Sequence, residues 1–252
     1  MFCDLKVDKL IDDFTTMQST LEQSMPRLAL FENYIIDNKG EKKYNITKGI
    51  RNVAFLDNFH ACLFRLHEFC VAVEFFQGKV RFERKENDFP EGYKQKLFST
   101  IAADSLRSAL DIYSKSIAWF YDLKNKETLG FSYKEFIKPV KEFSVPISRE
   151  ANSIYQSKPY QLIKDLRDSE KHSGLGKRHF KLVIHDKKFE AEVKNPEPLN
   201  FQKIESACCD LLNMLLNLMH VSTKEIIAHN KSFISKNDKF AKLDNNGRLI
   251  GI

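Results

Sequence analysis

The sequence predicts an all-α protein: an up-and-down helical bundle with an N-terminal helical arm and a small β-hairpin insertion. Apolar residues recur at helical spacing over several long segments. Nine Gly and seven Pro in 252 residues are too few for a turn-rich all-β fold. The 21 Phe and the 42% hydrophobic content provide enough apolar surface for a sizeable core, which excludes disorder as the main state.

Residues 1–46 are predicted to form the N-terminal helical arm. Apolar residues follow a helical spacing from residue 4 to residue 25, and Pro26 ends this helix. A short apolar piece and a turn follow, so the arm is expected to lie against something larger.

Residues 47–230 are predicted to form the bundle itself. Long helices are expected over residues 51–77, 93–125 and 201–228. The first and the third of these are apolar on more than one face, which is typical of helices in the centre of a protein. Long helices joined by loops favour an up-and-down arrangement.

Three shorter helices are predicted between the second and third long helices, over residues 132–143, 148–157 and 158–172. A capping-box pattern at Ser132 opens the first of them. Ser148 is the predicted N-cap of the second.

Residues 179–194 differ from the rest because apolar and polar residues alternate on both sides of a central Asp-Lys pair. This pattern predicts the β-hairpin insertion. Residues 231–252 are polar and are predicted to be an extended C-terminal tail.

The composition excludes several classes of protein. No run of about 18 apolar residues is present, so we expect no membrane span and no membrane partner. The first residues are acidic, unlike the basic start of a secretory signal, and a cytoplasmic location is expected. The net charge of +6 is only mildly basic and indicates a nucleic-acid partner only where it is concentrated.

Neither a metal nor a cofactor is predicted. The five Cys include no CxxC pair, and four of them lie in apolar helical stretches, which predicts buried reduced thiols. His60 and His67 share a helix face, but no third ligand is spaced with them, so core or interface histidines are expected. Phosphate-binding glycine loops, zinc-protease motifs and hydrolase elbows do not occur in the sequence.

The segment 166–174, LRDSEKHSG, combines an arginine, a carboxylate and a histidine at the end of a predicted helix. Asp168 and His172 are four residues apart, so they share a face and could hydrogen-bond, which would orient the imidazole. Arg167 offers a fork-shaped cation suited to phosphate. Arg167 and His172 point about 140° apart on an ideal helix. They converge only if the helix ends at this point, for which Gly174 provides the signal, or if the long Arg167 side chain wraps around the helix. The alternative is a solvated last turn, since basic residues favour helix C-termini.

A polar seam, Asp104, Arg107 and Asp111, lies on one face of an otherwise apolar helix in IAADSLRSALDIY. Charges in such a line must be solvated or paired with groups from another helix. One interpretation is internal pairing along an exposed face. The other is a seam that faces Arg167 and His172.

LRDSEKHSG resembles the signature of the HEPN superfamily, which is an arginine, a polar residue, a short spacer and a histidine. The spacer between Arg167 and His172 is four residues, within that family's range. The LRSALD helix before it is similar to the corresponding helix of bacterial HEPN-like proteins. The resemblance covers about residues 50–230, as helix order and one short motif. It implies a homodimer in which the motifs of two protomers line a shared cleft.

The resemblance further implies a metal-independent endoribonuclease of a toxin–antitoxin or phage-defence system, with RNA as substrate and an antitoxin or another protein as partner. Other members lack activity and bind a protein or a nucleotide, and accidental similarity is the third hypothesis. The segment from residue 171 to residue 188 contains six basic residues and one acidic residue, so its net charge is +5. Its members Lys171, Lys177, Arg178 and Lys181 are candidates for holding an RNA backbone. The alternative is a solvated hairpin, since Lys on an edge strand also discourages aggregation.

Overall fold

The structure is a computed structural model. It describes residues 2–24, 34–36, 42–44, 46–79, 93–173, 179–185, 188–194, 200–237, 242–243 and 249–250. Side chains are described for residues 2, 4–22, 51, 53–79, 97–168 and 200–229.

The described part of the chain is mainly helical, which confirms the predicted all-α class. Its helices, in chain order, are η1 (Phe2–Asp4), α1 (Val7–Ser24), α2 (Ile46–Phe76), α3 (Tyr93–Phe120), η4 (Tyr133–Ile137), α4 (Lys138–Val140), α5 (Val145–Gln156), α6 (Lys158–Ser173) and α7 (Phe201–Asn237).

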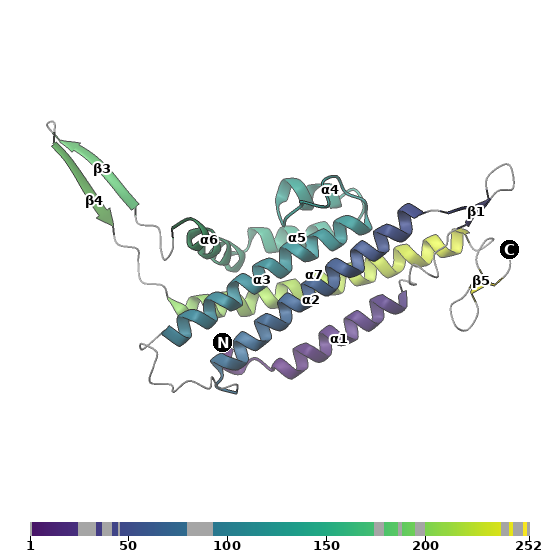
Figure 1. Cartoon of the computed structure of the whole chain (residues 1–252), viewed down its shortest axis with the longest axis horizontal. Helices are drawn as coiled ribbons and strands as arrows, with labels where there is room; N and C mark the ends of the chain where they lie inside the picture. Colours follow the sequence, from purple (N-terminus) through teal and green to yellow (C-terminus); the bar gives the residue numbers. More distant parts are fainter. Residues whose placement is uncertain are drawn as a thin grey trace.

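Three long helices, α2, α3 and α7, lie side by side along the long axis of the molecule (Figure 1). Helices α2 and α3 are antiparallel. The Phe75 ring, near the end of α2, stacks on the Phe98 ring, near the start of α3, with centroids 5.3 Å apart. At the opposite ends of the same two helices, Phe55 meets Phe120 at 5.9 Å. Helices α5 and α6 pack on α7, and α6 also contacts α3.

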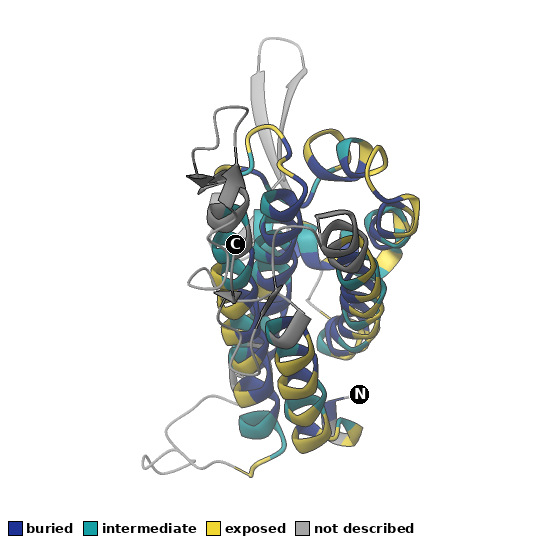
Figure 2. Ribbon diagram, turned by 90° about the vertical axis from the view of Figure 1, so that its right-hand side faces the viewer, coloured by how far each residue is buried: buried dark blue, intermediate teal, exposed yellow. Residues whose placement is uncertain are grey.

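The core lies between these helices, where Figure 2 shows the buried residues facing inward. Phe59 and Leu66 of α2, Leu106 of α3 and Leu215 of α7 are all 0% exposed. Because α2 carries apolar residues on more than one face, it buries side chains against α1 on one side and α3 on the other. The central position predicted for residues 51–77 and 201–228 therefore holds.

The first helix, α1, contacts α2 and α7 through one apolar face. Phe14 and Leu21 are buried there in the same cluster as the side chains of the long helices. The two histidines of α2 lie at this interface: the His67 ring meets the Phe14 ring edge-on at 6.1 Å, and His60 Nε2 lies 3.1 Å from Glu22 Oε1. The division into an arm, a bundle and a tail stays a prediction.

Two helix boundaries differ from those predicted around α3 and α5. Helix α3 ends at Phe120, not near residue 125, because Asp122 and Asn125 adopt left-handed backbone conformations with φ of 57°. Helix α5 begins at Val145, because Ser144 accepts a hydrogen bond from the Ile147 backbone N–H at 3.3 Å. Ser148, the predicted N-cap, is buried and donates to the carbonyl oxygen of Ile137 at 2.9 Å instead.

Ser132 forms the N-cap half of the predicted capping box: its Oγ accepts from the Glu135 backbone N–H at 3.2 Å, and the Glu135 carboxylate accepts from Ser132 Oγ at 3.5 Å. The turn that it opens, η4, is π-helical. At the other end of the chain, α7 continues to Asn237, beyond the predicted end near residue 228. The tail predicted from residue 231 is therefore helical in its first part.

Short strands pair antiparallel as β1 (Tyr34–Ile36) with β2 (Lys42–Tyr44), β3 (His179–His185) with β4 (Lys188–Lys194), and β5 (Lys242–Leu243) with β6 (Leu249–Ile250). In the second pair the register sets His179 opposite Lys194. The β-hairpin insertion of the bundle stays a prediction, because the side chains that would hold it lie outside the described residues.

Within the described residues, Cys62, Cys70 and Cys208 are buried free thiols and Cys209 is a partly buried one. None of the described helices carries an apolar run that would span a lipid bilayer.

Candidate functional site

Helix α6 brings the arginine of the LRDSEKHSG motif to the bundle. Ser157 precedes the helix, and its Oγ accepts from the Tyr160 backbone N–H at 3.2 Å. Tyr160, Ile163 and Leu166 are spaced by three residues and are buried, so this face of α6 is fixed against the core. Arg167 follows Leu166 directly and reaches α3.

The Arg167 side chain meets two carboxylates of α3. Its Nη1 donates to Asp111 Oδ2 at 2.9 Å, and its Nε lies 3.2 Å from Asp104 Oδ1. The Nε contact is an ion pair but not a hydrogen bond. Arg167 Nε is therefore buried without a hydrogen-bond partner among the described residues. The Arg167 side chain is 21% exposed and Asp104 is 52% exposed. The arginine is therefore held at the edge of the core, with Asp104 on its solvent side.

Asp111 is the centre of this group. Besides Arg167, it accepts hydrogen bonds from Arg107 Nη1 and, at 2.9 Å, from the Phe131 backbone N–H. The loop after α3 can approach so closely because residue 130 is a glycine, where a Cβ would lie 3.3 Å from Asp111 Oδ1. The carboxylate thus joins α3, the following loop and α6.

An aromatic ring closes the inner side of the cluster. The Arg107 guanidinium lies over the Tyr160 ring, 5.3 Å from its centroid, and the Tyr160 hydroxyl donates to the Phe131 carbonyl oxygen at 3.2 Å. Burial raises the pKa of Tyr160, although the nearby positive charge of Arg107 lowers it. The hydroxyl therefore stays protonated at neutral pH and acts here as a hydrogen-bond donor.

We call Asp104, Arg107, Asp111 and Arg167 the ion cluster. The structure brings these four predicted residues together, so the seam on α3 does face Arg167. Two cations balance two carboxylates, which suits a group mostly removed from water.

The other predicted residues are less fully described. Asp168 is partly buried beside Arg167. The backbone of α6 includes Lys171 and His172, but their side chains lie outside the described residues. Consequently the Asp168–His172 hydrogen bond stays a prediction. Of the basic candidates beyond α6, Lys177 and Arg178 lie outside the described residues, and Lys181 is placed on β3 only by its backbone.

Chemically, the ion cluster can hold one guanidinium in a fixed position before any ligand arrives. A fixed guanidinium can stabilise charge on a phosphate without reorganising during the reaction. Because Arg167 Nε and Nη1 already face carboxylates, an incoming phosphate would have to use its remaining N–H groups or displace Asp104, the more exposed partner. Among the described residues, no group of three or more His, Cys, Asp and Glu side chains could hold a metal ion.

Tyr160 and Gly130 also belong to this site, although the sequence does not mark them as functional residues. Tyr160 occupies a helical core position, so its spacing indicates only burial, and its contact with Arg107 depends on how α6 crosses α3. Gly130 lies in a loop, and its close approach to Asp111 has no local signal.

Comparison of the chain with protein-family models, with curated proteins and with solved structures found no match. The resemblance to the HEPN superfamily therefore stays a prediction from the motif and the helix order.

Proposed function

We propose that the protein is a HEPN-like, metal-independent endoribonuclease whose site lies at the C-terminal end of α6. One observation supports it most: Arg167 is held by Asp111 and Asp104 of a neighbouring helix, five residues before His172 on the same helix. The held guanidinium would supply a fixed cation and the imidazole a proton-transfer group. Because α6 continues through His172 to Ser173, these two residues point about 140° apart around the helix, and the proposal requires the long Arg167 side chain or the second protomer to bring both groups to one phosphate.

In the proposed reaction the RNA supplies its own nucleophile, the 2′-hydroxyl. His172 removes its proton or protonates the leaving 5′-oxygen, a role typically worth about 10²- to 10⁴-fold in rate. Arg167 stabilises the negative charge that develops on the phosphate. Asp168 orients His172 through the ring nitrogen that does not react. The products are a 2′,3′-cyclic phosphate and a free 5′-hydroxyl.

The proposal extends to the partners. A homodimer would set two copies of His172 in one cleft, so that one acts as base and the other as acid. Lys171, Lys177, Arg178 and Lys181, on the proposed hairpin insertion and the chain leading to it, would hold the RNA backbone. The setting would be cytoplasmic, as a toxin restrained by a partner protein or as a phage-defence nuclease.

The test is incubation of the purified protein with mixed RNA in EDTA, beside His172→Ala and Arg167→Ala variants. We expect cleavage that leaves cyclic phosphate ends and is lost in His172→Ala. His220→Ala, at an exposed position of α7, is the matched control and should cleave as the unaltered protein does. Equal cleavage by the protein and by His172→Ala would overturn the assignment of His172.

A second function, a non-catalytic module that binds a protein or a nucleotide, is favoured by one contact pattern. Both described contacts of the Arg167 guanidinium are with carboxylates of the same chain, which is what a purely structural arginine needs. On this alternative, Arg167→Ala lowers the free energy of unfolding, and neither it nor the unaltered protein cleaves any RNA in the mixture.

A further inference from the structure

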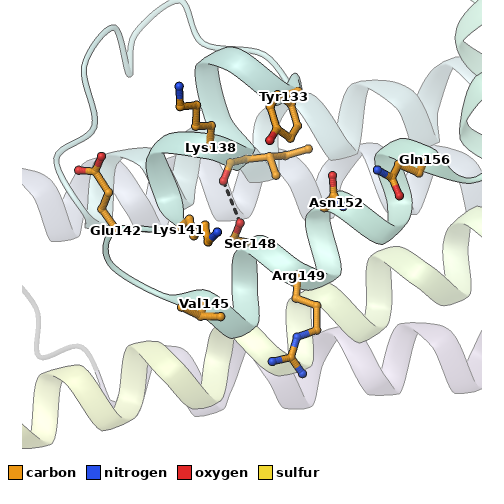
Figure 3. A pocket seen from close by; sticks show the side chains of 10 residues that line it. Tyr133, Lys138, Lys141, Glu142, Val145, Ser148, Arg149, Asn152 and Gln156 are labelled. Carbon is orange, nitrogen blue, oxygen red and sulfur yellow. Dashed lines mark hydrogen bonds between the residues drawn. The ribbon is translucent and has the colours of Figure 1, made fainter.

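A hollow of about 800 Å³ opens between the η4–α4 segment and α5, and no residue of the ion cluster lines it. This volume is within the usual range for sites that take small organic ligands. Figure 3 shows its walls: Tyr133, Lys138 and Lys141 come from η4, α4 and the residue after it, and Arg149, Asn152 and Gln156 come from α5.

The charge of the lining is positive. Lys138, Lys141 and Arg149 contribute three cations against the single carboxylate of Glu142. All four side chains are exposed, so the cations remain hydrated and available to an anion. In Figure 3 the Lys141 amine is drawn beside Ser148, and the Arg149 side chain extends from the side of α5 away from Tyr133. The lining thus favours a ligand with negative charge, such as a phosphate.

An exposed aromatic ring stands beside these cations. Tyr133 is 47% exposed and lines the hollow. Its ring is backed by that of Tyr155, with centroids 6.3 Å apart. The two ring planes are tilted by 43°. Exposed aromatic rings are the groups on which nucleic-acid bases stack, with little dependence on sequence.

The polar groups of α5 offer hydrogen bonds to such a base. Asn152 Oδ1 is buried and has no hydrogen-bond partner among the described residues, while Ser148 is already engaged with the Ile137 carbonyl oxygen. A buried amide with unmet hydrogen-bonding capacity is stabilised when it turns toward an incoming donor. Gln156 lies one helical turn further along the same face and is exposed.

A continuous series of contacts connects the hollow with the ion cluster. Tyr133 meets Tyr155, Tyr155 meets Tyr160 at 5.7 Å, and Tyr160 lies under the Arg107 guanidinium at 5.3 Å. The hollow and the cluster are therefore separated by only two tyrosine rings.

We propose that this hollow binds one nucleotide unit, with its base on Tyr133 and its phosphate held by Lys141 and Arg149, and that this unit belongs to single-stranded RNA. The assignment to RNA rather than to a free nucleotide rests on the proposed ribonuclease function. The nucleotide chemistry of the site does not depend on cleavage.

The test measures binding without cleavage. The full-length His172→Ala protein is titrated against a fluorescently labelled 12-nucleotide single-stranded RNA, with anisotropy as the readout, at several salt concentrations. The same measurement is made after adding Lys141→Ala with Arg149→Ala, or Tyr133→Ala. The matched control carries Lys124→Ala with Lys224→Ala, two exposed lysines outside the hollow. The five positions substituted in addition to His172 are exposed, and thermal unfolding verifies that every variant is folded.

We expect the Lys141/Arg149 variant to bind the RNA about tenfold more weakly. The slope of the logarithm of the binding constant against the logarithm of the salt concentration should become shallower by about 1.4, since two phosphate contacts are lost. Tyr133→Ala should weaken binding by about five- to a hundredfold, Tyr133→Phe should not, and the control should bind as before. Unchanged binding in both hollow variants would overturn the site, as would the absence of any RNA or nucleotide binding.

Competition by AMP and ATP separates the two sources of a nucleotide. If unlabelled RNA displaces the labelled RNA and neither AMP nor ATP does, the assignment to RNA is supported. If AMP or ATP binds at micromolar concentration and the hollow variants lose that binding, the hollow is a site for a free nucleotide, and its assignment to RNA is overturned. Should the hollow variants lose RNA binding while the unaltered protein cleaves nothing, the hollow is confirmed and the ribonuclease proposal fails.

Discussion

Asp111 accepts hydrogen bonds from two arginines and one backbone N–H, and its side chain is only 23% exposed. An amide at this position keeps the shape of the side chain but loses the charge that neutralises Arg107 and Arg167. We therefore expect Asp111→Asn to lower the free energy of unfolding by about 2 kcal/mol, because two largely buried cations lose their shared partner.

This loss can be measured by urea unfolding, followed through the fluorescence of Trp119, the single tryptophan. Asp165→Asn, at an exposed position of α6, is the matched control and should change the stability by less than about 0.5 kcal/mol. An equal change in the two variants would show that the cluster contributes no stability.

A buried hydroxyl pair joins α3 to α7. Tyr113 and Ser222 are fully buried and hydrogen-bonded to each other, and Ser222 can also donate to the Leu218 carbonyl oxygen at 2.7 Å. Tyr113→Phe removes one hydrogen bond while Ser222 keeps a partner. We expect a loss of about 1 kcal/mol in the same unfolding measurement. Tyr133→Phe, at an exposed ring, should have no comparable effect, and a Tyr113→Phe variant as stable as the unaltered protein would contradict the importance of this pair.

The charged residues of the ion cluster could be predicted because each has a local signal. Asp104, Arg107 and Asp111 interrupt an apolar helix on one face, and such charges require partners. Arg167 was recognisable from its place in the motif. The pairing itself could not be predicted, since it depends on how α6 crosses α3. The sequence left two interpretations open, internal pairing along an exposed face and a seam that faces Arg167 and His172. The hollow beside α5 was missed for a similar reason: Tyr133, Lys141 and Arg149 are ordinary surface residues until tertiary structure sets them around one space.

Among the elements, α1 has the clearest energetic role. Phe14 is 1% exposed and lies in the cluster shared with α2 and α7. Phe14→Ala should destabilise the protein by about 3–4 kcal/mol, because it removes a large buried ring and leaves a cavity. Thr16→Ala, on the exposed face of the same helix, should cost less than about 0.5 kcal/mol.

The measurement for α1 is the midpoint of thermal unfolding, followed by circular dichroism. If Phe14→Ala melts only α1 and leaves the main transition unchanged, the segment is a detachable arm. A single transition at a lower temperature would show that α1 folds with the bundle, as its buried contacts with two long helices indicate.

Helix existence was predictable here, whereas several helix ends were not. In a long helix many apolar residues carry the same helical spacing, so the sequence predicts α2, α3 and α7. An end depends on one or two residues. Ser144 and Ser148 are both plausible N-caps, and the choice was made by tertiary contacts: Ser148 is needed for the Ile137 carbonyl oxygen, which leaves the cap to Ser144. The left-handed conformations of Asp122 and Asn125 likewise have no strong sequence signal.

The chain as a whole buries several weak acids in neutral form. Burial raises the pKa of Cys70 to about 12 and raises the pKa values of Cys62 and Cys208 as well. It also raises the pKa values of Tyr113 and Tyr121 above the ordinary value of 10.0. Once unfolded, these groups ionise near their ordinary values, whereas the folded protein keeps them protonated. Their contribution to stability is therefore fully present below about pH 9 and is lost as the pH rises toward 12.

We accordingly expect the free energy of unfolding to fall steeply between pH 9 and pH 11. Each buried thiol contributes up to about 1.4 kcal/mol per pH unit to that slope, since the unfolded state loses a proton that the folded state retains. Urea unfolding at pH 8, 9, 10 and 11 in the presence of a reductant measures it. Cys62→Ala has no thiol to ionise, so it should be less stable at pH 8 but have a shallower slope above pH 9. The same slope in Cys62→Ala and the unaltered protein would mean that Cys62 ionises in the folded state, which its fully buried position between the long helices opposes.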